Sequence, residues 1–541
     1  MKSIGFKNFR RFEKLDPLQL GDITFFVGGN NAGKSTVVKA MMLVFDNLSA
    51  RTLISDSGMT FDAPTFRLDA NRIHEVHIGT FGRALHKPYP EQKELVLEAD
   101  VDNYHFQYVL NGDTESTQAN AGIKSLEIIN THSKVRYFFD FQKSEVIVNY
   151  NTSVLWDFAR SYSSFREIRD AKEVKQQIEN LQNQRSEIVH SLKNFEGDAV
   201  TLARLNSNFK AIEKKIEALK KSADPFGGRV KIEDVKYKDT FVLSEKIEKR
   251  NLLNWLLSRI ANKFKERFYF SLDDTITPAE LDGRRRKKLT QEDIAFGRMV
   301  DNDLDHISVI RAAYSIEYIA AHSASQKVLF SIEDKNDYMA SVIREFKQCR
   351  IEEGSREDLF ITRWMNELEI GLRYKIESIS GEAYTVDITN KQGYEMPLAD
   401  MGMGSIQMML LLFKLATIIR VCREIDSLII VEEPEQNIHP KLQSKLAELF
   451  AEVNQEYGFR FVIETHSEYM IRKSQIQVAA MQFANQEELE QKCPIKTYYF
   501  PGDSEPDQKP YNMRYRTDGN FENDFGSGFY DVASDLAFQT F

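Results

Sequence analysis

The segment from Gly28 to Thr36, GGNNAGKST, constrains the fold of this 541-residue chain more than any other feature. It satisfies the pattern G-x-x-x-x-G-K-S/T. The apolar, β-rich run from Ile23 to Val27 precedes it, and the helix-compatible run from Thr36 to Leu48 follows it. Glycines let backbone N–H groups turn toward phosphate oxygens, and a following helix points its positive end at them. The sequence therefore predicts a strand, a phosphate-binding loop and a helix in succession.

The residue types in this loop predict how it would hold a nucleotide. Lys34 would reach the β- and γ-phosphates, and the hydroxyl of Ser35 would ligate magnesium. The predicted cofactors are therefore ATP and Mg²⁺. The residues predicted to bind the nucleotide in this segment are Gly28, Asn30, Asn31, Ala32, Gly33, Lys34, Ser35 and Thr36.

A second apolar run, Leu428 to Val431, ends in the carboxylates Glu432 and Glu433. A parallel core strand delivers its last side chains to the ligand edge of a sheet. There Glu432 can hold the magnesium shell, and Glu433 can orient or deprotonate the attacking water. Alone, the run would be interpreted as a buried strand followed by a solvated acidic turn. Together with the phosphate loop, it favours a Walker B strand.

The next apolar run, Phe459 to Ile463, ends in Glu464-Thr465-His466-Ser467. A single histidine after a strand is usually a loop residue. This one follows the strand after Walker B, so we predict that His466 contacts the γ-phosphate. The predicted catalytic residues are Lys34, Glu433 and His466.

A glycine-containing segment, Leu398 to Gln407, precedes the Walker B run and leads into the apolar sequence MMLLLFKLATII. Small residues at a helix start can form an anion-binding N-terminus, which a second phosphate-contacting element would require. The alternative is a flexible turn that caps a buried helix. The candidate nucleotide contacts in this segment are Gly402, Gly404, Ser405 and Gln407.

Between these motifs the composition changes twice. From about Glu75 to Tyr150, the runs EVHIGTF, ELVLEADV, FQYVL, VRYFFDF and EVIVNY predict antiparallel strands. Residues 166–223 are rich in Lys, Glu, Gln and Asn, and their apolar residues recur at heptad spacing on both sides of Gly197. This pattern predicts a short antiparallel coiled-coil hairpin, and two amphipathic helices packed on a globular core are the alternative.

A helix-leaning region extends from the end of this insert to about Arg373. Within it, the basic run Arg284 to Lys288 could contact a nucleic acid or form a solvated loop. From about Leu410 the sequence predicts an alternation of elements: helix 406–422, strand 427–431, helix 440–454 and strand 459–463.

We therefore predict an α/β P-loop head, with a mixed-sheet lobe and a helical lobe, into which the coiled coil is inserted. The predicted parts are 1–165 for the first portion of the head, 166–223 for the coiled coil, 224–395 for the helical lobe and 396–541 for the second portion of the head.

Composition limits the setting in which the chain acts. Its net charge of −10 repels polyanions, so a nucleic-acid contact would need a local basic patch. The three cysteines are far apart, which fits a reducing compartment. The first residues contain no uninterrupted apolar stretch of the kind found in a secretory signal, and the apolar run Ile406 to Arg420 looks too short to span a bilayer. We expect a cytoplasmic protein with no membrane role.

The ordered motifs GGNNAGKST, GMGSIQ, IIVEEPEQNIHP and IETHSEYMIR resemble those of ABC-type ATPases of the SMC, RecF and OLD-like branch. The opening SIGFKNFRRFEK is also similar to that family's N-terminus. The resemblance covers nearly the whole chain. It implies that Gly402, Gly404, Ser405 and Gln407 form the signature, that Glu435 to Pro440 form the D-loop, and that His466 is the switch histidine.

Three departures from the family pattern matter. The first Walker B acid is Glu432, where many relatives have Asp. The signature differs from the LSGGQ form, which argues against a transporter subunit. The glutamine of the Q-loop is not identified: Gln92, Gln107 and Gln142 are candidates, and Phe81 to His86 looks most like that region.

The resemblance also implies an assembly. In this family the phosphate loop of one head faces the signature of another, so a homodimer or higher homo-oligomer is expected. The size and motif set are most similar to the ATPase subunit of Septu-type antiphage systems, some of them retron-associated, which work with a separate HNH nuclease.

Three functional hypotheses follow. The first is an ATPase that gates a partner effector, an HNH-type nuclease, in antiphage defence, with no nuclease activity of its own. The second is a RecF- or RecN-like repair protein that clamps DNA and would use the run Arg284 to Lys288; DNA or RNA is thus a candidate partner. The third is a scaffold that binds ATP but scarcely hydrolyses it, against which Glu433 argues.

Overall fold

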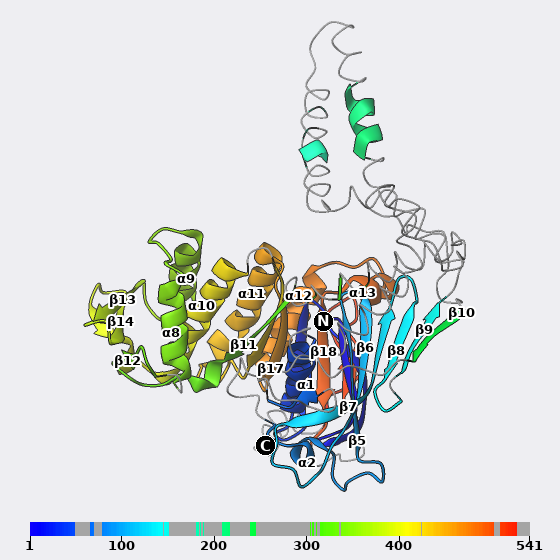
Figure 1. Cartoon of the computed structure of the whole chain (residues 1–541). Helices are drawn as coiled ribbons and strands as arrows, with labels where there is room; N and C mark the ends of the chain where they lie inside the picture. Colours follow the sequence, from blue (N-terminus) through cyan, green and yellow to red (C-terminus); the bar gives the residue numbers. More distant parts are fainter. Residues whose placement is uncertain are drawn as a thin grey trace, which may run out of the picture. The chain divides into compact units, whose positions relative to one another are not determined.

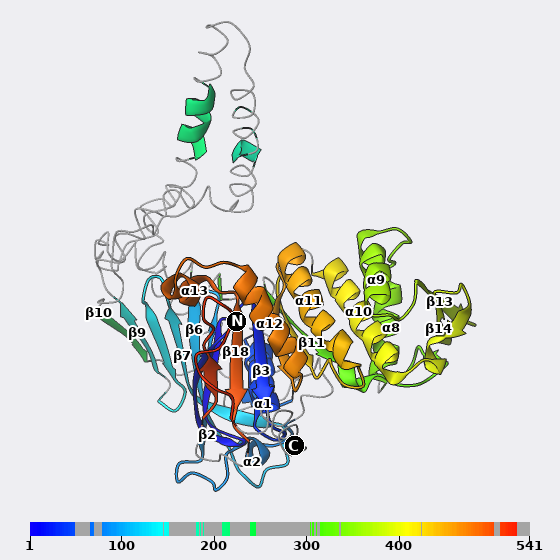
Figure 2. The same cartoon turned by 180° about the vertical axis from the view of Figure 1, so that it is seen from behind.

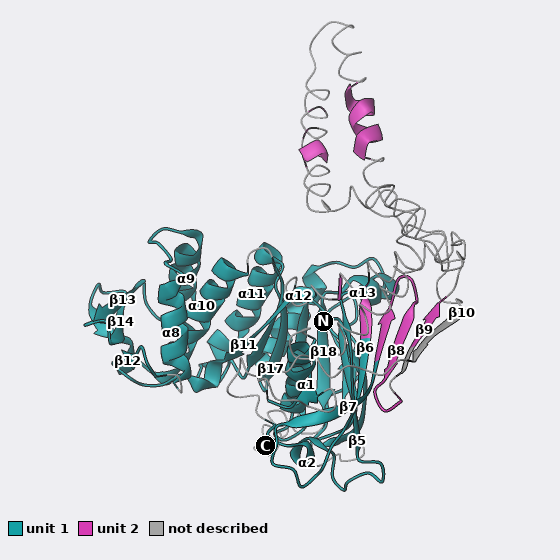
Figure 3. Ribbon diagram, viewed as in Figure 1, with its two compact units in different colours: residues 1–102, 106–126, 308–541 teal, residues 103–105, 127–307 magenta. Residues whose placement is uncertain are grey.

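The structure, a computed structural model of the whole chain, describes two compact units (Figure 3). Unit 1 comprises residues 1–102, 106–126 and 308–541, and unit 2 comprises residues 103–105 and 127–307. The residues described are 1–48, 65–69, 78–143, 145–150, 180–182, 184, 188, 208–216, 239–244, 303, 306, 307, 310, 314–334, 337–422, 425–502 and 509–526.

A six-stranded sheet forms the centre of unit 1 (Figure 1). Its strands in spatial order are β11 (Tyr314–Ala320), β16 (Asp426–Glu432), β17 (Arg460–Thr465), β3 (Ile23–Gly28), β18 (Ile495–Phe500) and β19 (Tyr511–Met513). The first five are parallel to one another, and β19 is antiparallel to β18. The carboxyl ends of β3, β16 and β17 therefore meet at one edge, although β17 is far from β3 in the chain.

The helices that follow these strands are fixed by local capping. α1 (Lys34–Asn47) starts after Gly33, and α11 (Pro440–Tyr457) starts with proline and ends at Gly458, which has a φ of 72°. α12 (Glu468–Ala480) is capped by Ser467, whose side chain accepts a hydrogen bond from the backbone N–H of Met470. These caps set where each helix starts relative to the sheet edge.

One layer of helices packs beside the sheet. α8 (Tyr338–Gln348) and α9 (Arg356–Glu367) contact α10 (Met403–Val421), and α11 contacts α12; the two views show α8 to α12 side by side (Figures 1 and 2). Apolar side chains of α10, α11, β3, β16 and β17 belong to one buried core. Burial of this many apolar side chains is the main favourable term that holds the lobe together.

α10 is the one described helix that is long and apolar enough to cross a membrane. It has 19 residues, four more than the apolar run expected from the sequence, and 72% of its apolar window is buried inside the protein. Such burial is that of a core helix, because its apolar side chains already contact protein.

An antiparallel sheet packs on α1 in unit 1, and α1 contacts β1 (Ser3–Phe9), β3, β4 (Thr65–Arg67) and β5 (Glu94–Val101). The strand order is β6-β5-β1-β2, with β2 at Phe12–Gln19 and β6 at Tyr104–Asn111. Buried and part-exposed residues alternate along β5 and β6, as expected for strands with one face against the core. This sheet supports the helix that follows the phosphate loop.

The remaining described elements of unit 1 are short. A four-stranded sheet has the order β12-β14-β13, with β15 beside β14. The bounds are β12 (Phe330–Ser331), β13 (Arg373–Ile379), β14 (Ala383–Thr389), β15 (Glu395–Pro397), α2 (Phe81–Ala84), α13 (Gln486–Lys492), and the 3-10 turns η4 (Ala321–Ser323) and η5 (Leu398–Asp400).

In unit 2, β8 (Arg136–Asp140), β9 (Glu145–Tyr150) and β10 (Asp239–Ser244) are antiparallel, and the end of β7 (Asn120–Asn130) lies beside β8. Asp303 is fully buried there. It accepts hydrogen bonds from the hydroxyls of Tyr104 and Tyr137 and from the amide of Asn130, at 3.0, 2.6 and 2.6 Å. These bonds hold the chain at residue 303 against three strands.

The predicted α/β fold is confirmed. The predicted strands at 94–101, 106–110, 135–141, 145–150, 427–431 and 459–463 and the helices at 406–422 and 440–454 are present within a few residues. Two expectations are wrong. The region from the end of the insert to about Arg373 was expected to lean helical, but it contains the strands Asp239–Ser244, Tyr314–Ala320 and Phe330–Ser331. Residues 78–80 are not strand, and Phe81 starts α2.

Other expectations lie largely or wholly outside the described residues. The basic run Arg284 to Lys288 is one of them. Within the predicted coiled coil, residues 208–216 are helical, as are those described between 180 and 188. The hairpin and the four-part domain division therefore stay predictions.

Candidate nucleotide-binding site

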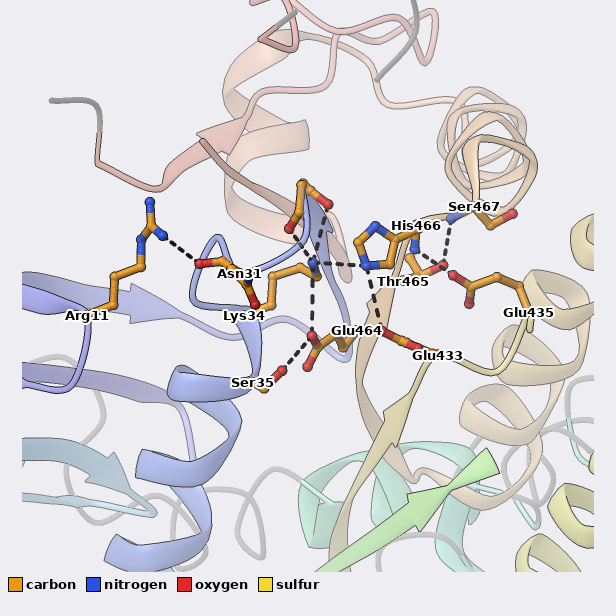
Figure 4. A network of polar contacts seen from close by, with 12 residues as sticks. Arg11, Asn31, Lys34, Ser35, Glu433, Glu435, Glu464, Thr465, His466 and Ser467 are labelled. Atoms are coloured by element: carbon orange, nitrogen blue, oxygen red, sulfur yellow. Dashed lines mark hydrogen bonds and ion pairs between the residues drawn. The ribbon is translucent and has the colours of Figure 1, made fainter. Parts of the chain in front are cut away.

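A cavity of about 640 Å³ lies at the carboxyl edge of the parallel strands in unit 1. This volume is in the range of small-molecule sites. The residues that line it are Asn30, Asn31, Lys34, Ser35, Glu433, Glu435, Gln436, Glu464 and His466. They come from the loop after β3, the loop after β16 and the end of β17. Figure 4 shows Lys34 between Glu464 and His466, with Ser35 beside Glu464 and Glu433 beside His466.

Two glycines give the phosphate loop its path. Gly28 has a φ of 140°, and a Cβ there would lie 2.1 Å from the carbonyl oxygen of Phe500. Gly33 has a φ of 103°, and a Cβ there would lie 2.4 Å from the ring of Phe12. Only glycine satisfies both the left-handed backbone and the lack of space. The guanidinium of Arg11 also donates to the backbone oxygen of Asn31 at 2.6 Å, which holds the loop from outside (Figure 4).

The ammonium of Lys34 lies at the centre of the cavity wall. Its Nζ donates to the backbone oxygens of Gly28 and Gly29, at 3.2 and 2.9 Å, and contacts Nε2 of His466 at 3.2 Å. The side chain is 3% exposed. Burial lowers the pKa of Lys34, and the nearby carboxylate of Glu464 opposes that shift.

Ser35 contacts a carboxylate that the sequence did not single out. Its hydroxyl donates to Oε1 of Glu464 at 2.8 Å. Glu464 is also 4.0 Å from Nζ of Lys34, and burial, followed by the charge of Glu432, raises its pKa to about 7. The hydroxyl of Ser35, which is predicted to ligate magnesium, therefore lies beside the buried carboxylate of Glu464. Both groups present oxygen atoms, and Mg²⁺ prefers oxygen ligands.

The two Walker B carboxylates have different surroundings. Oε2 of Glu432 accepts a hydrogen bond from the hydroxyl of Tyr318 in β11 at 2.5 Å, and Glu432 is not among the residues that line the cavity. Glu433 does line the cavity. Its φ is 43°, an uncommon backbone conformation for a glutamate, and its N–H donates to the backbone oxygen of Glu464 at 2.8 Å. Such strain is found at functional sites, where neighbouring structure holds it in place.

His466 connects Lys34 to Glu433. Nε2 of His466 is 3.7 Å from Oε1 of Glu433, in addition to its contact with Lys34 (Figure 4). Burial and the charge of Lys34 lower the pKa of His466, so the imidazole is neutral near pH 7. A neutral Nε2 can accept a hydrogen bond from the Lys34 ammonium.

Glu435 holds the backbone of this histidine. Its Oε1 accepts a hydrogen bond from the N–H of His466 at 2.5 Å, and the residue is 8% exposed. Burial raises its pKa. The sequence placed Glu435 only within the predicted D-loop segment, and its bond to His466 connects that segment to the predicted switch histidine.

The predicted signature residues lie elsewhere in unit 1 and do not line the cavity. Gly402 precedes α10, and a Cβ there would meet nothing within 4 Å. A Cβ on Gly404 would lie 2.5 Å from the backbone oxygen of Asn437. Oε1 of Gln407 accepts a hydrogen bond from the amide of Asn437 at 3.2 Å, and Gln407 is fully buried. The predicted signature segment therefore packs against the predicted D-loop segment of the same chain.

The structure thus brings six of the fifteen predicted site residues together at the cavity. Those that line the cavity are Asn30, Asn31, Lys34, Ser35, Glu433 and His466; those that do not are Gly28, Ala32, Gly33, Thr36, Glu432, Gly402, Gly404, Ser405 and Gln407. None of the candidate Q-loop glutamines lines it, and Gln107 instead donates to Glu98 at 3.4 Å. Glu464 was missed, although its place directly after the apolar run Phe459 to Ile463 was a usable signal.

Comparison with known proteins adds to this geometry. A family model described as AAA ATPase domain matches residues 1–471. A search of curated proteins finds no significant match.

The solved structures that resemble this chain include SMC head domains. One, from Pyrococcus furiosus, has an extended coiled coil and is bound to the C-terminal domain of ScpA; it is 9% identical, with a TM-score of 0.32, and the match covers 100% of this chain and 98% of that one. A head with a coiled coil and joint from Pyrococcus yayanosii is 12% identical, with a TM-score of 0.31 and coverages of 96% and 97%. The SMC head from Thermotoga maritima is 7% identical, with a TM-score of 0.29 and coverages of 92% and 94%.

The family assignment rests on the model that matches residues 1–471, most of the chain. It agrees with the cavity, in which the phosphate loop, the carboxylate of Glu433 and the imidazole of His466 meet at the edge of a parallel sheet. This chain belongs to the AAA ATPase domain family and is an ATP-hydrolysing P-loop ATPase.

Proposed function

We propose that ATP and Mg²⁺ bind between two copies of this chain, with the phosphate loop of one copy facing the signature of the other. The observation that supports this is the division within the chain: Lys34, Ser35, Glu433 and His466 line one cavity, while the signature, 402–407, lies outside it. A second copy would supply the missing contacts. The expected assembly is a homodimer or a higher homo-oligomer.

Within each site the residues have separate tasks. Lys34 and the loop N–H groups hold the β- and γ-phosphates, and Ser35 holds the metal ion, with Glu432 in its outer shell. Glu433 accepts the proton of the attacking water or orients it, and His466 contacts the γ-phosphate. When bound, Mg²⁺ would neutralise charge that develops on the phosphate oxygens.

Complementation between two inactive variants tests the shared site. Lys34→Ala removes the phosphate contact, and Ser405→Arg blocks the signature at a partly exposed position. Each alone should lose turnover, whereas a mixture should recover roughly a quarter of wild-type activity, because half the dimers are mixed and each holds one intact site. ATP-dependent dimers of Glu433→Gln, measured by analytical ultracentrifugation, provide the second readout. No recovery, together with a monomer in ATP, would rule out the shared site.

For the biological role, we favour an ATPase in the cytoplasm that restrains or licenses a separate effector, an HNH-type nuclease, in antiphage defence. The support is the motif resemblance to the ATPase of Septu-type systems, some of them retron-associated. Co-purification with the product of the neighbouring gene, followed by assays of ATP turnover and DNA cleavage, tests this role. Cleavage by this chain alone that is lost in Lys34→Ala would contradict it.

The RecF- or RecN-like alternative depends on the run Arg284 to Lys288, which lies outside the described residues. Duplex binding with a salt dependence that weakens when this run is neutralised would favour the repair role over effector gating. We retain the division into 1–165, 166–223, 224–395 and 396–541 as a working description of the domains.

A further inference from the structure

Glu464 occupies a position between the two halves of the nucleotide site. It is in β17, where it pairs with Glu432 of β16 on one side and with Phe26 of β3 on the other. The residue is 4% exposed and lines the cavity. The sheet therefore holds this carboxylate between the Walker B strand and the phosphate loop.

The two oxygens of Glu464 differ in their contacts. Oε1 accepts the hydrogen bond from the hydroxyl of Ser35. Oε2 is buried and has no hydrogen-bond partner in the part of the chain that the structure describes. A buried carboxylate oxygen without a partner is costly, so its retention beside a ligand cavity points to a ligand that completes it.

The charge around the cavity indicates what kind of ligand this is. Glu433, Glu435 and Glu464 all line it, against the single lysine Lys34. A triphosphate adds further negative charge to this space. A divalent cation is the species that makes these groups compatible, because it binds carboxylate and phosphate oxygens together.

The donor set also matches the way in which Mg²⁺ is usually held. Mg²⁺ is bound through one or two carboxylates together with substrate phosphates and water, rather than by a cage made only of protein. In agreement, no group of three or more His, Cys, Asp or Glu side chains arranged to hold a metal ion occurs among the described residues. Ser35 and Glu464 place two adjacent oxygen atoms at one side of the cavity.

We propose that Glu464 is a direct ligand of the divalent cation that accompanies ATP, beside the hydroxyl of Ser35. This inference rests on the proposed role of Ser35 as a metal ligand. In this arrangement the carboxylate closest to the cation belongs to Glu464 of β17. Glu432 lies farther from the cation and accepts a hydrogen bond from Tyr318.

The test measures metal binding rather than turnover. Full-length wild type and Glu464→Gln are saturated with the non-hydrolysable analogue AMP-PNP, and Mn²⁺ is titrated while free Mn²⁺ is followed by electron paramagnetic resonance. The dissociation constant for Mn²⁺ should rise at least about tenfold in Glu464→Gln, since even outer-shell partners of a metal site are worth that much. AMP-PNP binding in EDTA should be equal or tighter, because a negative charge is removed.

Glu435→Gln is the matched control. It makes the same change in charge at another buried residue of the same cavity. Its Mn²⁺ dissociation constant should change far less than that of Glu464→Gln. An equal change in the Mn²⁺ dissociation constant of both variants would mean that the effect comes from the overall negative charge of the cavity. That result would overturn direct ligation by Glu464.

Two further outcomes separate the alternatives. The proposal would be overturned if Glu464→Gln bound Mn²⁺ as tightly as wild type does and bound metal-free AMP-PNP more tightly. Glu464 would then compete with the nucleotide phosphates for the hydroxyl of Ser35. AMP-PNP binding that Lys34→Ala does not weaken would instead contradict the proposed nucleotide site itself.

If Glu464→Gln does not fold, a second variant, Glu464→Cys, tests the same proposal. Glu464→Cys should bind Cd²⁺ in the presence of AMP-PNP and give the ultraviolet absorption of a thiolate bound to cadmium, because a thiolate selects soft metals. Lack of that absorption in a folded, AMP-PNP-bound Glu464→Cys protein would overturn the proposal.

Discussion

At the scale of single residues, the nucleotide site places basic side chains beside buried carboxyl groups. Burial lowers the pKa of Lys34 and His466 and raises that of Glu464 to about 7 and that of Glu435. In each case desolvation, which disfavours the charged form, is the largest cause. Such pKa shifts are typical of functional sites, and the charge of a bound ligand changes the protonation of these groups.

Glu435 provides a residue-scale prediction. Glu435→Ala removes the acceptor for the N–H of His466, and an unsatisfied buried N–H costs roughly 1–3 kcal/mol. His466 should move away from Lys34, so turnover should fall while affinity for AMP-PNP is kept. Glu435→Gln, which retains an amide oxygen, should recover much of the turnover. The measurement is kcat alongside the dissociation constant for AMP-PNP, and wild-type kcat in Glu435→Ala would contradict this role.

The sequence was informative about some of these residues and not about others. Lys34, Ser35, Glu433 and His466 were predictable because each follows or ends a strand pattern, and parallel strands bring such ends together. The contact between Ser35 and Glu464 was not. It depends on β17 lying between β3 and β16, a spatial order that the chain order does not reveal.

At the scale of elements, the start of α10 contacts the loop after β16. Gly404 lies against the backbone of Asn437, and Gln407 bonds to its side chain. A displacement of either segment, the predicted signature or the predicted D-loop, would therefore break contacts with the other.

Two glycines in this contact give a matched pair. Gly404→Ala places a Cβ 2.5 Å from the backbone oxygen of Asn437, so one of the two segments must shift; Gly402→Ala meets nothing within 4 Å. We expect Gly404→Ala to lower the free energy of unfolding by about 1–3 kcal/mol, as overpacking does, and Gly402→Ala to change it by less than about 0.5 kcal/mol. Chemical denaturation measures both. Equal stability of the two variants would contradict the close approach.

Element prediction from the sequence worked best for strands with clear patterns. ELVLEADV and EVIVNY were predicted with their full bounds, since apolar residues alternate along the first and β-branched residues enrich the second. β11 was missed because its seven residues follow a long region of helical composition. Its parallel pairing with β16 is a tertiary contact that local propensity does not report.

At the scale of the whole chain, the site depends on residues far apart in sequence. Lys34 and His466, whose side chains are in contact, are separated by 432 positions. The order of the motifs in the sequence indicated this meeting. The structure of the long intervening segment was not predictable in the same way, because heptad spacing also fits two amphipathic helices packed on a core.

Asp303 gives a prediction about the stability of unit 2. Burial raises the pKa of Asp303, and its three hydrogen bonds and the charge of His306 oppose that shift. The folded state therefore binds more protons than the unfolded state above about pH 4, so this residue's contribution to stability is complete below that pH and is lost as pH rises through the raised pKa. Asp303→Asn, which mimics the protonated form, should remove this loss.

The check on Asp303 is thermal unfolding of wild type and Asp303→Asn from pH 4 to pH 8. The melting temperature of the variant should rise relative to that of wild type as the pH increases. A difference that is constant across this range would contradict a raised pKa for the buried carboxyl.

In the proposed site, the loop Gly28 to Thr36 and the residues after β16 and β17 act on one triphosphate. ATP binding and MgATP hydrolysis by wild type, Glu433→Gln and Lys34→Ala test it most directly. Glu433→Gln should bind ATP as tightly as wild type and hydrolyse it at least about a hundredfold more slowly, because the water-orienting base is lost. Lys34→Ala should lose binding itself, by roughly ten- to a hundredfold. Undiminished hydrolysis in Glu433→Gln would contradict the account.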